Sequence, residues 1–324
     1  MCTAITYTTN HHYFGRNLDF EHSFQEKVVV VPRNFQLNFR MLPPLLHPNA
    51  MIGMATVSAG YPLYHDATNE FGLSMAGLNF PGLARYSPAR SGKDNVASFE
   101  LIPWILGKCA TVDEAEGQLV RLHITDDAFS DAFPPTPLHW FIADTHRSIT
   151  VETTEEGLKV YHNLVGLLTN NPPFPYHLYH LRSHMHVSAQ PATNRFSQQL
   201  PLEAFSNGMG SLGLPGDYSS ASRFVRAAFV KLNSPMEDTE EAAINQFFHI
   251  LKSVAMPRGC VRMADGKYEI TLYSCCCNTK RGIYYYTTYT DSRIHAVDMH
   301  REALNGNRVI TYPLITEPEF HLQN

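Results

Sequence analysis

The cysteine at position 2 offers the chemistry of a nucleophile that carries its own base. Initiator methionine is usually removed when the next side chain is small, which would leave Cys2 with both a thiol and a free α-amine. Such an amine has a pKa of about 7.7–8.0, so a useful fraction is unprotonated at neutral pH and can accept the thiol proton. The alternative is that Cys2 belongs to an arbitrary frayed terminus.

A cation and an acid follow close behind, in the segment Gly15-Arg16-Asn17-Leu18-Asp19. In strand geometry Arg16 and Leu18 face one side, and Asn17 and Asp19 face the other. A guanidinium beside a thiol favours the thiolate, and a carboxylate beside an α-amine orients it by a charge-assisted hydrogen bond. The competing interpretation is a surface ion pair, which contributes little to stability.

The other histidines and cysteines, and a glycine-rich segment, do not match the patterns of metal, catalytic or phosphate-binding sites. The histidines at 177, 180, 184 and 186 lack the H-E-x-x-H or paired-cysteine patterns of zinc sites, so we expect a polar, partly exposed stretch and no metal. Three cysteines at 275–277 alternate along a predicted strand, and we expect buried, inert thiols. The glycine-rich segment 208–216 lacks the ending of a phosphate-binding loop and indicates turns.

Composition limits the class of protein. The chain has 324 residues, 44% hydrophobic and 17% charged, with a net charge of -5, which excludes a disordered protein and disfavours nucleic acid as a partner. The N-terminus lacks the pattern of a signal peptide, and no run of about 18 apolar residues predicts a membrane span. Six cysteines, three of them contiguous, make a poor disulfide framework, so we expect reduced thiols and a cytoplasmic protein.

The predicted elements begin and end with strands and place helices in two blocks. We expect strands at 3–8, 13–20, 27–31, 51–57, 72–78, 138–143, 148–152, 158–162, 270–273, 282–289 and 308–312. We expect helices at 98–109, 112–123, 221–232 and 239–254, whereas 172–194 reads as a proline-interrupted, polar, His-rich segment. This order is not the strict alternation of a parallel doubly wound sheet. It predicts a single α+β domain, 1–324, of two antiparallel sheets with helices outside.

At this point the chain resembles the choloylglycine hydrolase family, the N-terminal-nucleophile hydrolases that include bile salt hydrolases and penicillin V acylases. Each short motif is weak alone, but their number and order make the resemblance specific, and they run nearly end to end. The motifs are Met1-Cys2-Thr3, Phe14-Gly15-Arg16-Asn17-Leu18-Asp19, Pro32-Arg33-Asn34-Phe35, Asn69-Glu70-Phe71-Gly72-Leu73, Ala76-Gly77-Leu78-Asn79-Phe80-Pro81, Leu168-Thr169-Asn170, Gly213-Leu214-Pro215-Gly216-Asp217, Ser222-Arg223-Phe224 and Gly282-Ile283-Tyr284-Tyr285-Tyr286.

The resemblance implies a four-layer αββα sandwich, a homotetramer, no cofactor, and roles for six residues. These are Cys2 as nucleophile with its freed amine as base, Asp19 as the acid that holds the amine, Arg16 as the cation beside the thiol, Asn170 as the oxyanion-hole side chain, Asn79 as a second oxyanion contact, and Arg223 as the support of the nucleophile's electrostatics.

Substrate choice within the family is addressed by position 79 and its context Ala-Gly-Leu-Asn-Phe-Pro, which resembles that of bile salt hydrolases. Penicillin V acylases commonly carry Tyr where this chain has Asn79, so the resemblance favours a bile salt hydrolase acting on glycine- or taurine-conjugated bile acids. A steroid needs an apolar wall, for which we expect Leu18, Phe129 and Phe133, although the two phenylalanines fit docking of their loop onto the core equally well. The loop 205–210 resembles a region that shapes the mouth of the site.

Two alternatives stay open at this point. One is a penicillin V acylase of the same family. The other, from a different class, is a non-catalytic protein that retains the fold and uses its histidines and cysteines for metal binding or redox sensing.

Overall fold

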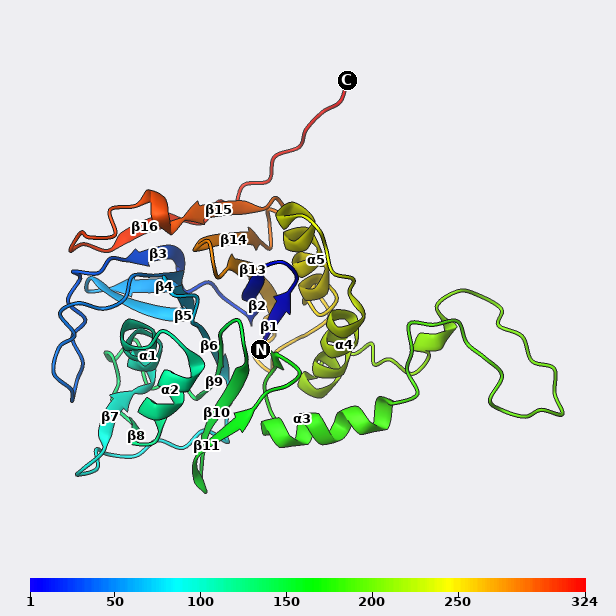
Figure 1. The fold of residues 1–324 in the computed structure, drawn as a ribbon, viewed down its shortest axis with the longest axis horizontal. Coiled ribbons are helices and arrows are strands. Elements are labelled where there is room, and N and C mark those ends of the chain that lie inside the picture. The colour runs from blue at the N-terminus through cyan, green and yellow to red at the C-terminus, as the bar shows by residue number, and fades with distance from the viewer.

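Two β-sheets pack face to face between helices in the computed structural model, which describes residues 1–324 (Figure 1). All strand pairs within the two large sheets are antiparallel. Helices α4 and α5 cover the outer face of one sheet, and α1 packs on the outer face of the other. The layers are therefore αββα, as the sequence predicted.

The first sheet, here called sheet A, contains Cys2, Arg16 and Asp19, three of the candidate site residues. Its strand order is β12 (Leu167–Leu168), β1 (Cys2–Thr8), β2 (His12–Phe20), β13 (Ile270–Asn278), β14 (Ile283–Thr288) and β15 (His295–Asp298). The N-terminal strand thus lies between β12 and β2, which brings residue 2 beside residues 167–170.

The second sheet, sheet B, has eight strands. Their order is β11 (Gly157–His162), β10 (Ser148–Thr154), β9 (Leu138–Ala143), β6 (Ser74–Asn79), β5 (Tyr61–Asn69), β4 (Met51–Ser58), β3 (Lys27–Val31) and β16 (Ile310–Pro313). The valine run of β3 is buried on both faces, as its unbroken β-branched sequence predicted. A short parallel pair joins β7 (Asp94–Ala97) to β8 (Leu122–Thr125).

Five α-helices complete the layers. They are α1 (Leu101–Lys108), α2 (Val112–Leu119), α3 (Phe174–Leu181), α4 (Ser220–Asn233) and α5 (Glu240–Lys252), with 3₁₀ turns at Ser98–Glu100, Arg182–His184, Met209–Ser211 and Met299–Arg301. Ser219 caps α4 by accepting a hydrogen bond from Ser222 N, which leaves the Ser220 hydroxyl free for another partner.

Apolar side chains fill two separate regions of the interior. One core packs residues of both sheets with α4 and α5, including a stacked pair of Phe14 and Phe141 whose ring centroids are 5.5 Å apart. The other packs sheet B against α1 and α2 around Trp104 and Trp140. The catalytic candidates lie where sheet A meets the first of these cores.

Several element predictions were wrong. The predicted helix 112–123 ends at Leu119, and the segment after it forms β8. Strand β5 lies between the two strands expected at 51–57 and 72–78, and its Pro62, His65 and Asp66 hid it by breaking the alternation. Helix α3 occupies the segment read as interrupted, because its prolines sit at the helix start, where proline is tolerated. Strand β15 was also not predicted.

None of the helices has both the length and the hydropathy needed to cross a membrane. All six cysteines are unpaired, and only Cys260 is exposed.

Gly15 permits the close approach of β2 to β13. A Cβ atom at this position would lie 1.9 Å from the carbonyl oxygen of Cys275, and backbone cannot move aside cheaply. We therefore expect Gly15→Ala to lower the free energy of unfolding by about 3 kcal/mol or more, measured by urea denaturation.

Gly117, in α2, provides the matched control. A Cβ there would meet nothing within 4 Å, so Gly117→Ala should raise stability by about 0.5–1 kcal/mol through helix propensity. Equal effects of the two substitutions would contradict this account of the β2–β13 contact.

Candidate active site

Cys2 begins β1 and lies against β2. Cys2 is directly opposite Leu18, and the hydrogen bonds between β1 and β2 continue beyond Cys2 to Met1, whose carbonyl oxygen accepts from Asp19 N at 2.9 Å. Since Ala4 faces Arg16 in the same register, Cys2, Leu18 and Arg16 share the face that points toward sheet B. The predicted division of Arg16 and Leu18 from Asn17 and Asp19 is confirmed by this pairing.

Arg223, on α4, holds Cys2 and the segment beside it. Its Nη1 donates to Cys2 O at 2.6 Å and to Thr3 Oγ1 at 2.7 Å, while Nη2 donates to Asn170 Oδ1 at 2.8 Å. The side chain is fully buried, and burial lowers its pKa although the charges of Asp19 and Cys2 raise it. A rigid guanidinium fork therefore fixes three groups relative to one another.

The amide of Asn170 has a defined orientation. Its Oδ1 accepts from Cys2 N at 2.8 Å and from Arg223, so its Nδ2 must point the other way, and it donates to Asn79 O at 2.7 Å. The backbone is held too, because Asn170 N donates to Ser220 Oγ at 2.8 Å. Asn79 thus approaches Asn170 through its carbonyl oxygen, on a half-buried residue at the end of β6.

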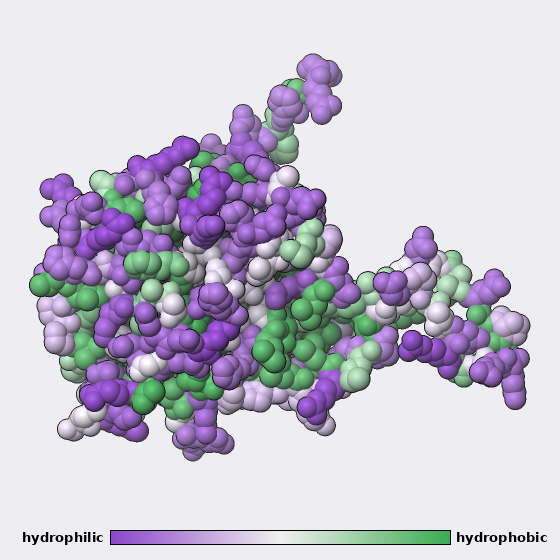
Figure 2. All heavy atoms as spheres, viewed as in Figure 1, coloured by the Kyte–Doolittle hydropathy of each residue, from purple (hydrophilic) through white to green (hydrophobic).

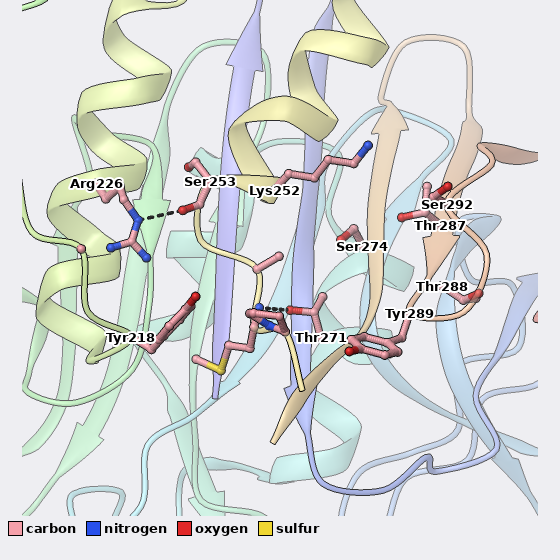
Figure 3. A pocket seen from close by; sticks show the side chains of 14 residues that line it. Tyr218, Arg226, Lys252, Ser253, Thr271, Ser274, Thr287, Thr288, Tyr289 and Ser292 are labelled. Atoms are coloured by element: carbon pink, nitrogen blue, oxygen red, sulfur yellow. Dashed lines mark hydrogen bonds between the residues drawn. The ribbon is translucent and has the colours of Figure 1, made fainter. Parts of the chain in front are cut away.

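Asp19 lies on the opposite, helix-facing side of sheet A. Its Oδ1 accepts from Thr271 Oγ1 at 2.6 Å, while Oδ2 is buried, has no hydrogen-bond partner and is 3.9 Å from Arg223 Nη1. Thr271 is fixed in turn by accepting from Met256 N at 2.8 Å (Figure 3). A bulge in β13 after Thr271 sets this threonine opposite Asp19.

Hydroxyl groups line the cavity behind Thr271. This cavity of about 470 Å³ is bordered by Thr271, Ser274, Thr287 and the cations Arg226 and Lys252 (Figure 3). Because Thr271 supports Asp19 from this side, the cavity backs the candidate site from across the sheet.

Arg16 is the second buried guanidinium of the site. It donates Nη1 to His65 O at 3.0 Å and to Gly77 O at 2.6 Å, both in sheet B, and its Nη2 has no partner. Burial lowers its pKa, but the charges of Cys2, Tyr273 and Asp66 outweigh burial and raise the pKa overall.

The α-amine of the described chain belongs to Met1. It donates to Asp19 O at 2.7 Å and forms an ion pair with the buried carboxylate of Glu269. Burial lowers the pKa of this amine, while the charges of Cys2 and Asp19 raise it. An amine at this terminus is therefore surrounded by acceptors, within a buried setting that favours its neutral form.

A polar network behind Asn170 was missed by the sequence reasoning. His139 lies between two acceptors, with Nδ1 3.1 Å from Glu152 Oε1 and Nε2 2.9 Å from Thr169 O. Glu152 Oε1 also accepts from Phe174 N at 2.9 Å, so the pair holds both sides of the Asn170 segment. Single polar residues within buried strands were the only signal, and they carry no spacing pattern.

His177 also departs from the prediction of a partly exposed histidine stretch. It is buried, its Nε2 is 2.9 Å from Asn170 O, and its ring stacks on Phe224 with centroids 4.7 Å apart. Burial lowers its pKa to about 4, so it donates to this carbonyl as a neutral ring. The polar histidine supports the backbone of Asn170 because α3 turns it inward.

The candidate wall residues lie in two places. Leu18 is buried beside Cys2. Phe129 is half-buried and packs on Tyr61, Phe99 and Phe133 with ring centroids 5.3–6.2 Å apart. These contacts match the docking of the loop onto the core, the alternative that the sequence left open.

The geometry thus joins a thiol, two buried guanidiniums, a carboxylate with a free oxygen and a fixed amide donor at one strand end. These groups are the parts required for nucleophilic attack with stabilisation of an oxyanion.

Comparison with known proteins gives concordant matches. Residues 2–312 match the model of the choloylglycine hydrolase family, linear amide C–N hydrolases. The chain is 48% identical to a bile salt hydrolase/transferase of Lactiplantibacillus plantarum over the full length of both. It superposes on the C2A mutant of conjugated bile acid hydrolase from Clostridium perfringens with a TM-score of 0.93, 37% identity and full coverage of both chains. A penicillin V acylase from Agrobacterium tumefaciens shares the fold, with a TM-score of 0.77, 20% identity and coverage of 97% and 92%.

The buried pair of His139 and Glu152 gives a structural prediction. Glu152→Gln keeps the shape but replaces a buried carboxylate oxygen, which contacts His139 Nδ1 and accepts from Phe174 N, by a weaker amide acceptor, so we expect a loss of about 1.5–3 kcal/mol in unfolding free energy. The exposed Glu155, in the following turn, is the control, and Glu155→Gln should change stability by less than about 0.5 kcal/mol. Coincident urea transitions for the two variants would refute the role of the pair.

Proposed function

The chain belongs to the choloylglycine hydrolase family of linear amide C–N hydrolases, and on that premise we propose that it cleaves glycine- or taurine-conjugated bile acids through Cys2. The observation that carries the proposal is the convergence of Arg223 and Asn170 on Cys2 at 2.6–2.8 Å. The names of the relatives, a bile salt hydrolase and a conjugated bile acid hydrolase, supply the substrate class.

Removal of Met1 makes the Cys2 nitrogen the α-amine. Asn170 Oδ1 already accepts from this nitrogen, and the unpartnered Oδ2 of Asp19 is available to hold the ammonium form. The amine takes the thiol proton, and the thiolate attacks the amide carbonyl carbon beside Arg16. The resulting oxyanion is stabilised by the second N–H of Asn170 Nδ2 and by the side-chain amide N–H of Asn79.

Collapse of the tetrahedral intermediate breaks the C–N bond. The α-ammonium returns its proton to the leaving nitrogen, so glycine or taurine departs as an amine and the bile acid stays on Cys2 as a thioester. Water then attacks the thioester carbonyl, the α-amine accepts its proton, and the bile acid leaves as the thiol is restored. No cofactor takes part in these steps.

The apolar steroid requires a wall beside the thiol. Leu18 supplies the part next to Cys2 because it is opposite Cys2 in the register. We propose that the exposed surface of Phe129 and Phe133 extends this wall from a loop, which is docked through Phe129 on Tyr61 and Phe99. Asn79, in place of the tyrosine common in penicillin V acylases, favours bile salts over penicillin V.

Cys2→Ala tests the nucleophile. We expect the release of glycine from glycocholate to fall by more than about 10³-fold, and Cys2→Ser to lose most turnover, because a hydroxyl is a poor substitute for a thiolate. Intact mass should show a mature chain that begins at Cys2. Cys260→Ala, which removes the exposed thiol, is the control and should keep full activity. Normal rates in Cys2→Ala would rule out the assignment.

A substrate panel separates the two members of the family. Release rates from glycocholate, taurocholate and penicillin V, measured side by side at equal concentration, should be at least about tenfold higher for one or both bile salts, because the apolar wall matches a steroid. A faster rate on penicillin V would instead favour the acylase.

We further infer a homotetramer, formed by the arm between α3 and α4. This segment, residues 185–218, leaves the body of the molecule and returns to it (Figure 1), and apolar side chains lie at its base and along it (Figure 2). Phe196 and Phe205 are 82% and 85% exposed, so both rings are available for burial against another subunit. The family resemblance supplies the number of subunits.

Size-exclusion chromatography with light scattering checks the assembly. Phe196→Ser with Phe205→Ser should convert a tetramer into smaller species, because burial of these rings would drive association. Phe71, exposed at the turn between β5 and β6, is the control, and Phe71→Ser should keep the wild-type mass. A monomeric wild type would contradict the inference.

We place the protein in the cytoplasm. The support is that all six cysteines are unpaired, with five of them buried, as suits a reducing compartment.

A further inference from the structure

Two side chains of opposite charge, Arg16 and Asp66, each extend from one sheet toward the other. Arg16 extends from sheet A and binds the carbonyl oxygens of His65 and Gly77 in sheet B. Asp66, the residue after His65, extends from sheet B toward sheet A. Arg16 is 0% exposed and Asp66 is 1% exposed, so neither charge is solvated by water.

Donors alone contact the carboxylate of Asp66. Tyr284 Oη donates to Oδ1 at 2.6 Å, Tyr273 Oη donates to Oδ2 at 2.7 Å, and Cys275 Sγ is 3.5 Å from Oδ1. A carboxylate that accepts at both oxygens and donates at neither fits the ionised form. The family motifs singled out from the sequence do not include Asp66, and the mechanism above does not use it.

The charges of Arg16 and Asp66 act on each other in the buried space between the sheets, where Arg16 binds the carbonyl oxygen of His65, the residue before Asp66. Burial raises the pKa of Asp66, and the Arg16 charge opposes this effect. In return, the Asp66 charge is among those that raise the pKa of Arg16 against its burial. An isolated buried guanidinium is costly, so a nearby anion stabilises it even without direct contact.

We propose that Asp66 is a positioning residue that supplies the counter-charge for Arg16. Its negative charge reduces the positive electrostatic potential that Arg16 produces at the Cys2 thiol. The proposal rests on the assignment of Cys2 as the nucleophile. An uncompensated guanidinium would over-stabilise the thiolate, and nucleophilicity falls as a thiol becomes more acidic. Asp66 therefore adjusts the reactivity of a sulfur that it does not touch.

Other charged or titratable groups lie around Asp66 and around Cys2. Around Asp66 they are Arg16, Tyr64, Tyr273, Tyr284, Cys275 and Cys277, and around Cys2 they are Arg16, Asp19, Arg223, Glu269 and the terminal amine. Arg16 belongs to both sets, which makes it the link between Asp66 and Cys2.

Asp66→Asn tests the proposal by removing the charge while keeping the shape. The readout is the rate of Cys2 alkylation by iodoacetamide as a function of pH, followed by mass of the N-terminal peptide, which excludes the signal of exposed Cys260. We expect the midpoint of the profile to move about 1 pH unit to lower pH, because the field of Arg16 at the sulfur is no longer offset. Alkylation needs no bile salt, so this result stands apart from the outcome of the substrate assays.

Tyr284→Phe covers the case in which Asp66→Asn does not fold. It removes one of the two hydroxyl donors that favour the ionised carboxylate, so we expect a smaller shift in the same direction. Tyr285→Phe is the matched control, because the next residue of β14 bonds Glu240 on the other face, and it should leave the profile unchanged. A folded Asp66→Asn or Tyr284→Phe with the wild-type midpoint, a shift to higher pH, or an equal shift in Tyr285→Phe would overturn the proposal.

Discussion

The buried guanidinium of Arg223 is the interaction on which the site depends. Three segments far apart in the sequence meet at it: the start of β1, the segment after β12 and the N-terminal part of α4. Since a planar fork donates in fixed directions, the positions of Cys2 O and Asn170 Oδ1 are set together. The strand ladder alone fixes Cys2 against β2 but leaves the orientation of the Asn170 amide undefined. Arg223 adds the second constraint.

Further hydrogen bonds hold the polar groups around this guanidinium in place. Thr271 supports Asp19 from the helix-facing side, and Ser220, His177 and the His139–Glu152 pair support the Asn170 segment. Such supporting hydrogen bonds keep a preorganised site from relaxing around its charges. Some buried polar atoms of this network have no hydrogen-bond partner, among them Arg16 Nη2, Asp19 Oδ2, Glu152 Oε2 and His177 Nδ1.

The sequence predicted two antiparallel sheets with outer helices and the division of β2 into two faces, because period-two alternation and turn residues are local signals, and the family resemblance added the αββα order of the layers. It located Cys2, Arg16, Asp19, Asn170 and Arg223, which the structure brings together, through a family resemblance and the chemistry of a terminal thiol. It missed β5, where Asp66 and His65 interrupt the apolar pattern. Their partners, Arg16 and the tyrosines of sheet A, lie far away in the sequence, so no local pattern accounts for these two residues. It also misjudged His177, because the burial of a histidine is decided by the packing of α3, which no local pattern encodes.

The order in which the chain is made bears on its N-terminus. In the folded protein the Met1 ammonium is paired with Glu269, and Cys2 is held by residues 170 and 223, all of which leave the ribosome long after residue 2. At about 5–20 residues per second, the terminus spends roughly ten seconds or more without these partners. A ribosome-associated aminopeptidase therefore meets an unfolded, accessible methionine. In the folded protein the same methionine is held by an ion pair with Glu269 and by the strand ladder, so we expect the removal of Met1 that the proposed mechanism requires to take place before these contacts form.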